Sequence, residues 1–144
     1  MTEKEKGHFA KKHPPDRKVN PLTAEAVKSR SPGGEIACAV AFEIVENQRS
    51  TSEEVGFTMD ALEVRVVKCQ LGLFGYKPTK RIVKPAQSVA AALRDEIKKA
   101  LVKDRLSCNA AWEIADRLGL RRLEVSSACE TMGIKISSCQ LGTF

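Results

Sequence analysis

Residues 139–144, which read Cys-Gln-Leu-Gly-Thr-Phe, repeat with one substitution an earlier stretch, Cys-Gln-Leu-Gly-Leu-Phe at residues 69–74. We call this shared stretch the Cys-Gln-Leu-Gly motif. The likeness continues upstream without a gap, because 11 of 41 positions are identical between residues 34–74 and 104–144. Chance would give roughly two or three identities, so the match indicates an internal duplication. The chain is therefore expected to contain two copies of one unit.

Charge is unevenly distributed along the 144 residues, which carry a net charge of +6. Residues 1–33 carry 8 basic and 4 acidic side chains, 34–76 carry 3 and 7, 77–103 carry 8 and 2, and 104–144 carry 5 and 5. Basic segments favour polyanions or acidic surfaces as partners. Aromatic residues make up only 5% of the chain, which argues against an aromatic stacking platform for single-stranded nucleic acid.

The compartment is predicted from what the sequence lacks. Its polar start is unlike a signal peptide, and its longest apolar run, residues 36–42, is too short to cross a bilayer. We expect a soluble, cytoplasmic protein without a membrane partner. In a reducing compartment its five cysteines are expected to be free thiols.

Turn and capping signals predict the organisation of the chain. A disordered basic tail (1–19) is expected before a first repeat (20–76) and a second repeat (77–144). Each repeat is predicted to run helix, helix, helix, strand, with caps at Asn20, Thr51, Ser88, Ser107, Gly119 and Gly133. Helices are expected from residue 21 to about 30, then over 36–47, 51–61, 88–103, 107–118 and 121–132. The strands 63–69 and 134–139 are predicted to pair with each other about a pseudo-twofold axis.

Residues 107–134 carry a recognisable pattern: Ile114-Ala115-x-x-Leu118-Gly119, then Val125-Ser126, then Met132-Gly133-Ile134. This segment resembles the helix-turn-helix of bacterial transcription regulators, and the trailing strand resembles the winged variety. The small Ala115 allows two helices to cross closely, and Gly119 accepts a left-handed turn. The resemblance implies a mainly α fold of two tandem three-helix winged-helix-like units with short β-strands and pseudo-twofold symmetry. The first copy departs from the pattern, with Asn47-Gln48-Arg49 at the turn and Gly56 inside the third helix.

The resemblance implies a DNA-binding transcriptional regulator whose partner is double-stranded DNA. In such proteins the N-terminal part of the third helix enters the major groove. The candidate contacts are Arg121, Arg122, Ser126, Ser127 and Thr131 on that helix, with Lys77, Lys80, Arg81 and Lys84 between the repeats.

Two observations oppose DNA reading. Helical geometry turns Leu123, Ser127 and Glu130 furthest outward, and Glu130 would repel phosphate. The third helix of the first copy presents Glu53, Glu54 and Asp60, which makes it a poor groove reader.

Two alternatives remain open. The protein is either an adaptor for protein partners whose helix-turn-helix fold has lost DNA binding, or a metal or redox sensor that uses its repeat-paired cysteines. Those cysteines are Cys38, Cys69, Cys108 and Cys139, and they include no Cys-x-x-Cys pair, so no metal site is predicted. His8 and His13 fall in the predicted tail, and no nucleophile–base pair or phosphate loop occurs. We therefore expect no enzyme activity and no cofactor, and we interpret the Cys-Gln-Leu-Gly motif as a structural turn.

Overall fold

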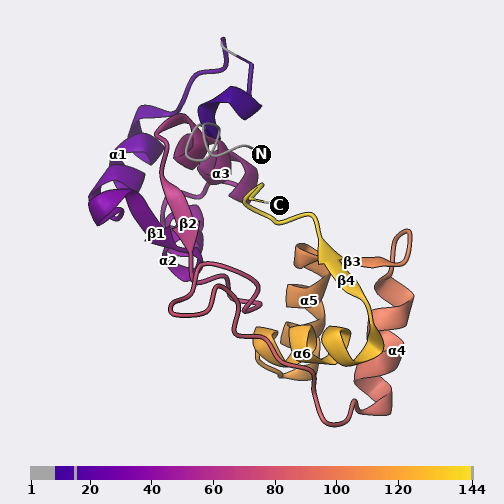
Figure 1. Cartoon of the computed structure of the whole chain (residues 1–144). Helices are drawn as coiled ribbons and strands as arrows, with labels where there is room; N and C mark the ends of the chain where they lie inside the picture. The colour runs from indigo at the N-terminus through magenta and orange to yellow at the C-terminus, as the bar shows by residue number, and fades with distance from the viewer. Residues whose placement is uncertain (1–8, 15, 144) are drawn as a thin grey trace. The chain divides into compact units, whose positions relative to one another are not determined.

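The chain is mainly helical and divides into two compact units in the computed structural model, which describes residues 9–14 and 16–143 (Figure 1). The first unit contains the described residues up to Lys68 together with Gln140–Thr143, and the second contains Cys69–Cys139. Among the described residues, none of the helices combines the length and apolarity needed to cross a membrane. Predictions that fall on residues 1–8, 15 and 144 lie outside the described residues.

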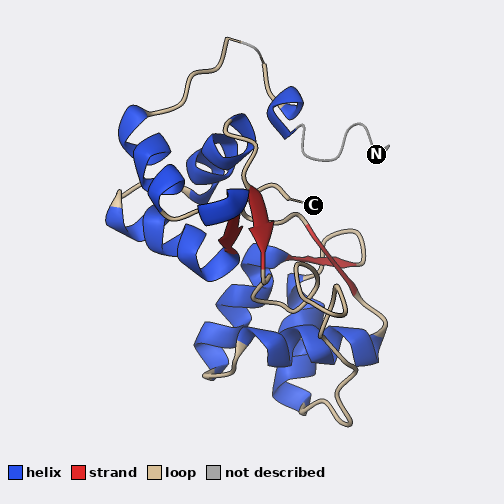
Figure 2. Ribbon diagram, turned by 60° about the vertical axis from the view of Figure 1, so that its left-hand side comes forward, coloured by secondary structure: helices blue, strands red, loops and turns tan. Residues whose placement is uncertain are grey.

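The two units share a series of α-helices and strands. Figure 2 colours the helices blue and the strands red. The first unit has the 3-10 helices η1 (Phe9–Lys12) and η2 (Pro32–Gly34), with α1 (Pro21–Ser29), β1 (Glu35–Ala37), α2 (Cys38–Asn47), α3 (Ser52–Ala61) and β2 (Arg65–Val67). The second unit has α4 (Ala91–Ala100), β3 (Arg105–Ser107), α5 (Cys108–Leu118), α6 (Arg122–Met132) and β4 (Lys135–Ser137). Adding 70 to the first residue of α1, β1, α2, α3 and β2 gives the first residue of α4, β3, α5, α6 and β4. The series in each unit is helix, strand, helix, helix, strand.

Most of the predicted caps are confirmed. Asn20 accepts a hydrogen bond from the Leu22 N–H at 2.9 Å, Thr51 accepts one from Glu54, and Ser107 accepts one from Ala110, the last two at 3.1 Å. Such caps satisfy N–H groups that have no partner within the first helical turn. Gly119 and Gly133 both end their helices in the left-handed conformation.

The predicted helix 88–103 is too long at both ends. Its N-cap is Ala90 and not Ser88, and it ends at Ala100. Lys103 and Asp104 adopt positive φ angles of 52° and 63° so that the chain can turn into β3. Tertiary pairing of β3 therefore overrides local helix propensity at residues 101–103.

The predicted pairing between strands 63–69 and 134–139 is wrong. β2 pairs in parallel with β1 and β4 pairs in parallel with β3, so each small sheet is built within its own unit. The central residue of each strand is buried, with Ile36 opposite Val66 and Leu106 opposite Ile136. β1 and β3 run directly into α2 and α5. Ile36 and Ala37 of β1 fall within the predicted helix 36–47, and Leu106 of β3 falls between the predicted helices 88–103 and 107–118, so neither strand is predicted from the sequence.

The segment predicted to be a disordered tail, residues 1–19, makes defined contacts in the part that the structure describes, residues 9–14 and 16–19. η1 packs on α3, and the His13 ring meets the Phe57 ring edge-on at 4.9 Å between centroids. The Arg17 guanidinium lies 3.9 Å from the Phe57 ring centroid, and His13 Nε2 lies 2.7 Å from Asp60 Oδ2. These contacts are with α3, so the composition of the segment alone does not reveal them.

The core of the second unit contains a thiol whose ionisation is expected to make stability fall in alkali. Burial raises the pKa of the Cys129 thiol from 9.0 to about 11, and the residue is 1% exposed. Because the folded state holds this proton more tightly, the stabilisation is complete below pH 9 and is lost as the pH rises to 11. At about 1.4 kcal/mol per pKa unit, the loss is on the order of 2–3 kcal/mol.

Urea unfolding followed by the fluorescence of Trp112, the sole tryptophan, measures this effect in the second unit. The control is Cys129→Ala, which has no thiol to titrate at this position. Its free energy of unfolding is expected to fall less steeply over the same pH range. Parallel pH profiles for the two proteins would contradict the assignment.

Candidate functional site

A tight turn at Gly119 joins α5 to α6. Gly119 turns the chain with a φ of 66°, and the Leu120 N–H donates to the Ala115 carbonyl at 2.9 Å. Ala115 and Val125 are fully buried where the two helices meet. The crossing of α5 and α6 is therefore set by the small Ala115, the left-handed turn at Gly119 and the apolar Val125.

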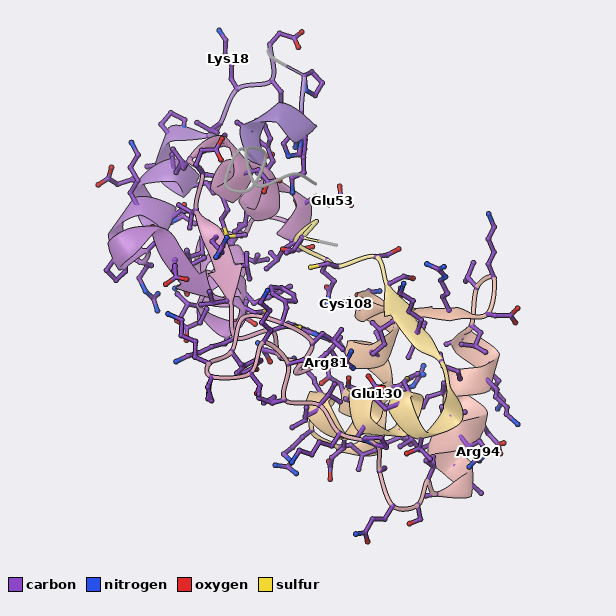
Figure 3. The ribbon with its side chains drawn as sticks, viewed as in Figure 1. Lys18, Glu53, Arg81, Arg94, Cys108 and Glu130 are labelled. Carbon is purple, nitrogen blue, oxygen red and sulfur yellow. The ribbon has the colours of Figure 1, made fainter. Side chains whose placement is uncertain are left out.

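The outer face of α6 is covered by residues 69–90, which join β2 to α4 and which we call the connector (Figure 1). A Cβ atom built on Gly72 would lie 2.6 Å from Leu123 Cδ1, so these two residues are in close contact. The Ala86 N–H donates to the Ser127 carbonyl at 3.1 Å. Arg81 forms an ion pair with Glu130, and both side chains are labelled in Figure 3. The face that sequence predicts to turn outward is therefore occupied by the chain itself.

The predicted DNA contacts consequently lie in different environments. Ser126 is 1% exposed, and its hydroxyl has no hydrogen-bond partner among the described residues. Thr131 donates its hydroxyl to the Ala86 carbonyl at 2.6 Å, and Ser127 is half-buried beneath the connector. Arg121, the N-cap of α6, has 79% of its side chain exposed, and Thr131 is exposed as well. On the connector Lys77, Lys80 and Lys84 are exposed, whereas Arg81 is held by Glu130.

Arg122 connects α6 to the first Cys-Gln-Leu-Gly motif. Its guanidinium lies 3.6 Å from the Trp112 ring centroid, and it donates a hydrogen bond to Gln70 Oε1. Leu71 is fully buried. The Gly72 carbonyl accepts hydrogen bonds from the Ile82 and Val83 N–H groups at 2.9 and 3.1 Å. The motif is therefore a turn docked between α6 and the following part of the connector.

Replacing Arg122 by methionine is expected to loosen this docking. The change keeps side-chain length but removes the contact with Trp112 and the hydrogen bond to Gln70, which together contribute about 1–2 kcal/mol. We expect a shifted Trp112 emission and a lower urea midpoint for the second unit. Arg121→Met is the matched control, because its exposed side chain should change stability by less than about 0.5 kcal/mol. Equal effects of the two substitutions would contradict the assigned contacts.

The first unit holds the second copy of the motif against α3. Leu141 is 3% exposed. A Cβ atom built on Gly56, in the middle of α3, would lie 2.2 Å from the Leu141 carbonyl oxygen and 2.8 Å from its carbon. Backbone can approach the helix this closely only where the helix residue is glycine. Lys12 Nζ donates to the Gly142 carbonyl at 3.2 Å and lies 3.1 Å from Asp60 Oδ2.

The two docked motifs share a common design. In each unit a segment crosses the third helix and donates a hydrogen bond to the carbonyl of the motif glycine. We call this segment the strap. It comprises residues 9–14 with 16–17 in the first unit and residues 79–87 in the second. Lys12 and Ile82, which make that contact, occupy equivalent positions in the two copies, as their residue numbers differ by 70. Asp60 forms an ion pair with Lys12, and Glu130 forms one with Arg81. The residue numbers of Asp60 and Glu130 also differ by 70. We call the third helix and strap that surround a motif the motif-docking site.

The cysteines of the motif differ in their surroundings. Cys69 is buried, and this desolvation raises the pKa of its thiol, although backbone N–H donors at Leu73 and Leu71 partly oppose the rise. Cys139 is half-buried. Within residues 9–14 and 16–143, no group of three or more His, Cys, Asp or Glu side chains is placed to hold a metal ion.

The net charge belongs to one unit. Residues 69–139 carry 13 basic and 7 acidic side chains, which gives +6. Residues 1–68 carry 11 of each, and 140–143 carry none, which gives zero. Electrostatic attraction to a polyanion is therefore expected at the second unit.

Sequence reasoning did not identify the motif-docking site, although one signal was present. A glycine inside a helix costs roughly 0.5–1 kcal/mol relative to alanine, so Gly56 indicated a close approach of another backbone to α3. The approaching segment, at Leu141, comes from the far end of the sequence. Comparison of the chain with protein-family models, curated proteins and solved structures finds no match.

Proposed function

We propose that this protein is a protein-interaction adaptor built from two helix-turn-helix-like units, each of which binds a Cys-Gln-Leu-Gly turn against its third helix. The main observation is the Leu141 backbone seated against Gly56, with Lys12 on the Gly142 carbonyl. Leucine supplies the buried apolar anchor, and the glycine that follows it, with a φ of 79°, supplies the bend.

The helix-turn-helix-like and winged-helix-like assignments are part of this proposal. They are supported by the α5–α6 turn at Gly119 and by the short strand that follows the third helix in each unit. The parallel strand that precedes the second helix distinguishes these units from a winged helix with only a trailing hairpin. Tandem duplication is supported by the constant offset between the starts of equivalent elements in the two units.

A peptide-binding experiment tests the proposal in the full chain. Leu141→Asp places a charge at a buried position, so the segment 140–143 is expected to leave α3 and open the site. A peptide with the sequence of residues 137–143 should then bind the variant under reducing conditions, as measured by titration calorimetry. The same peptide with aspartate in place of leucine is the control ligand.

The competition between bound and free segments gives a second readout. Wild-type protein holds its own segment, whose effective concentration is on the order of millimolar, and should bind the peptide far more weakly than Leu141→Asp. Amide exchange in α1 and α2 must show that the variant remains folded. A folded variant that ignores the peptide would falsify the adaptor proposal.

A second candidate function is binding of double-stranded DNA by the second unit, as in a transcriptional regulator. It is favoured by the net charge of +6 on residues 69–139 and by the exposed Lys77, Lys80, Lys84 and Arg121. With the connector across α6, contacts to phosphates are better supported than insertion of α6 into a groove. A covered helix predicts modest sequence preference and strong dependence on salt.

Charge substitutions separate this candidate from unspecific attraction. Lys80→Ala with Lys84→Ala should weaken binding to a random duplex pool and reduce the slope of log affinity against log salt by about 2. Lys18→Ala with Lys28→Ala removes the same charge from exposed sites of the first unit and is the control. If Arg121 contacts a base, Arg121→Ala should cost about 1–3 kcal/mol on a selected sequence. Identical salt slopes for both double variants would count against DNA binding by the second unit.

A further inference from the structure

We infer that the motif-docking site of the first unit also accepts residues 140–143 of a second copy of this chain, so that copies associate by exchanging this segment. The inference rests on the proposed function and names the partner of the same site. It concerns one segment and one helix, Gln140–Thr143 and α3.

The first unit is incomplete without a segment from far along the sequence. It contains the chain up to Lys68 and then Gln140–Thr143, whereas all residues between them belong to the second unit. Its contacts with the segment are local: the Leu141 backbone against Gly56, the buried Leu141 side chain, and Lys12 on the Gly142 carbonyl. Each of these contacts is available to an identical segment from another molecule.

The segment can leave without breaking any of the strand pairs. β4 ends at Ser137, and Ser138 adopts a left-handed φ of 56° before the chain enters the first unit at Gln140. Lys68, the equivalent residue in the first copy, has a φ of 52° immediately before the chain enters the second unit. Non-glycine residues rarely adopt this conformation, so both crossings begin at a bend that extended chain would relieve.

The chemistry of the site favours this chain's own motif as its ligand. The same motif occurs twice in the sequence, and each copy lies against a third helix with its glycine carbonyl bound by a strap. Exchange of an identical element between protomers is a low-cost route to association. The tethered segment competes at an effective concentration on the order of millimolar, so wild-type protein should remain single chains well below that concentration.

Complementation between two full-length variants tests the inference. Gly56→Ala closes the site on α3 but keeps an intact segment, and Leu141→Asp opens the site but spoils the segment. Analytical ultracentrifugation should show single chains for each variant alone and a 1:1 complex of two chains in the equimolar mixture. The control is Gly56→Ala mixed with the double variant Gly56→Ala/Leu141→Asp, in which neither chain has an open site.

The outcomes are distinguishable. A complex in the first mixture and none in the control supports exchange. A complex in both mixtures overturns it, because the chains then associate through another surface. If the mixture stays as single chains while Leu141→Asp binds the 137–143 peptide, exchange is overturned and the adaptor function stands. If that variant does not bind the peptide, both are overturned.

Discussion

Gly56→Ala is expected to expel residues 140–143 from α3 and to destabilise the first unit, although alanine is the better helix former. The added Cβ would lie 2.2 Å from the Leu141 carbonyl oxygen, which is backbone and cannot rotate away as a side chain can. Releasing Leu141 forfeits about 1.5–3 kcal/mol of burial, while the change from glycine returns about 0.5–1 kcal/mol of helix propensity. The net loss is about 1–2 kcal/mol, and amide exchange over residues 140–143 should approach that of an unfolded peptide.

A second background tests whether Gly56→Ala destabilises the first unit through its clash with the Leu141 backbone. With Leu141→Asp already present, the segment is gone and only helix propensity remains. Gly56→Ala should then stabilise the first unit by about 0.5–1 kcal/mol. Urea unfolding followed by circular dichroism measures both backgrounds, and destabilisation in both would show that the Leu141 contact is not the cause.

Ser126, which occupies the position in α6 equivalent to Gly56 in α3, supplies a matched comparison in the second unit. Its hydroxyl is buried and has no hydrogen-bond partner among residues 9–14 and 16–143. Ser126→Ala removes that hydroxyl and is expected to stabilise the second unit by about 1 kcal/mol. The two substitutions to alanine should therefore change stability in opposite directions.

Leu71→Ala is expected to have the largest effect on stability in the second unit. Leu71 is fully buried where the first motif docks between α6 and the following part of the connector, and truncating a buried leucine costs about 2–5 kcal/mol. Trp112 reports the unfolding of this unit, and its emission should also shift because Gln70 and Arg122 link it to the motif.

Leu118→Ala is the control, since it makes the same chemical change in α5 at a residue that is 37% exposed. Its cost should be less than about 1 kcal/mol. If the two leucine variants had equal urea midpoints, the motif would not be part of the folded second unit.

Local sequence signals predicted the helices well, because caps and turns act over short distances along the chain. Asn20, Thr51 and Ser107 cap helices where their side chains can reach an N–H group in the first turn. Gly119 and Gly133 end helices because a left-handed residue is needed at those points. The self-match of the sequence has the same offset of 70 residues as the starts of equivalent elements in the two units.

Non-local contacts could not be predicted in the same way. The short strands β1 and β3 gain stability only when β2 and β4 lie beside them, and two helices separate the strands of each pair along the chain. The strap of the first unit has the composition of a disordered tail and is ordered by Phe57 and Asp60 on α3.

The amino-acid sequence by itself determined the helices and most of their caps, because these follow from neighbouring residues. Only the tertiary structure decided which helix each Cys-Gln-Leu-Gly motif covers. That choice depends on the close approach of the Leu141 carbonyl to Gly56, which has no Cβ atom, and on the hydrogen bond from Arg122 to Gln70. Residues this far apart leave no periodic trace in a sequence, since only the folded backbone brings them within contact distance.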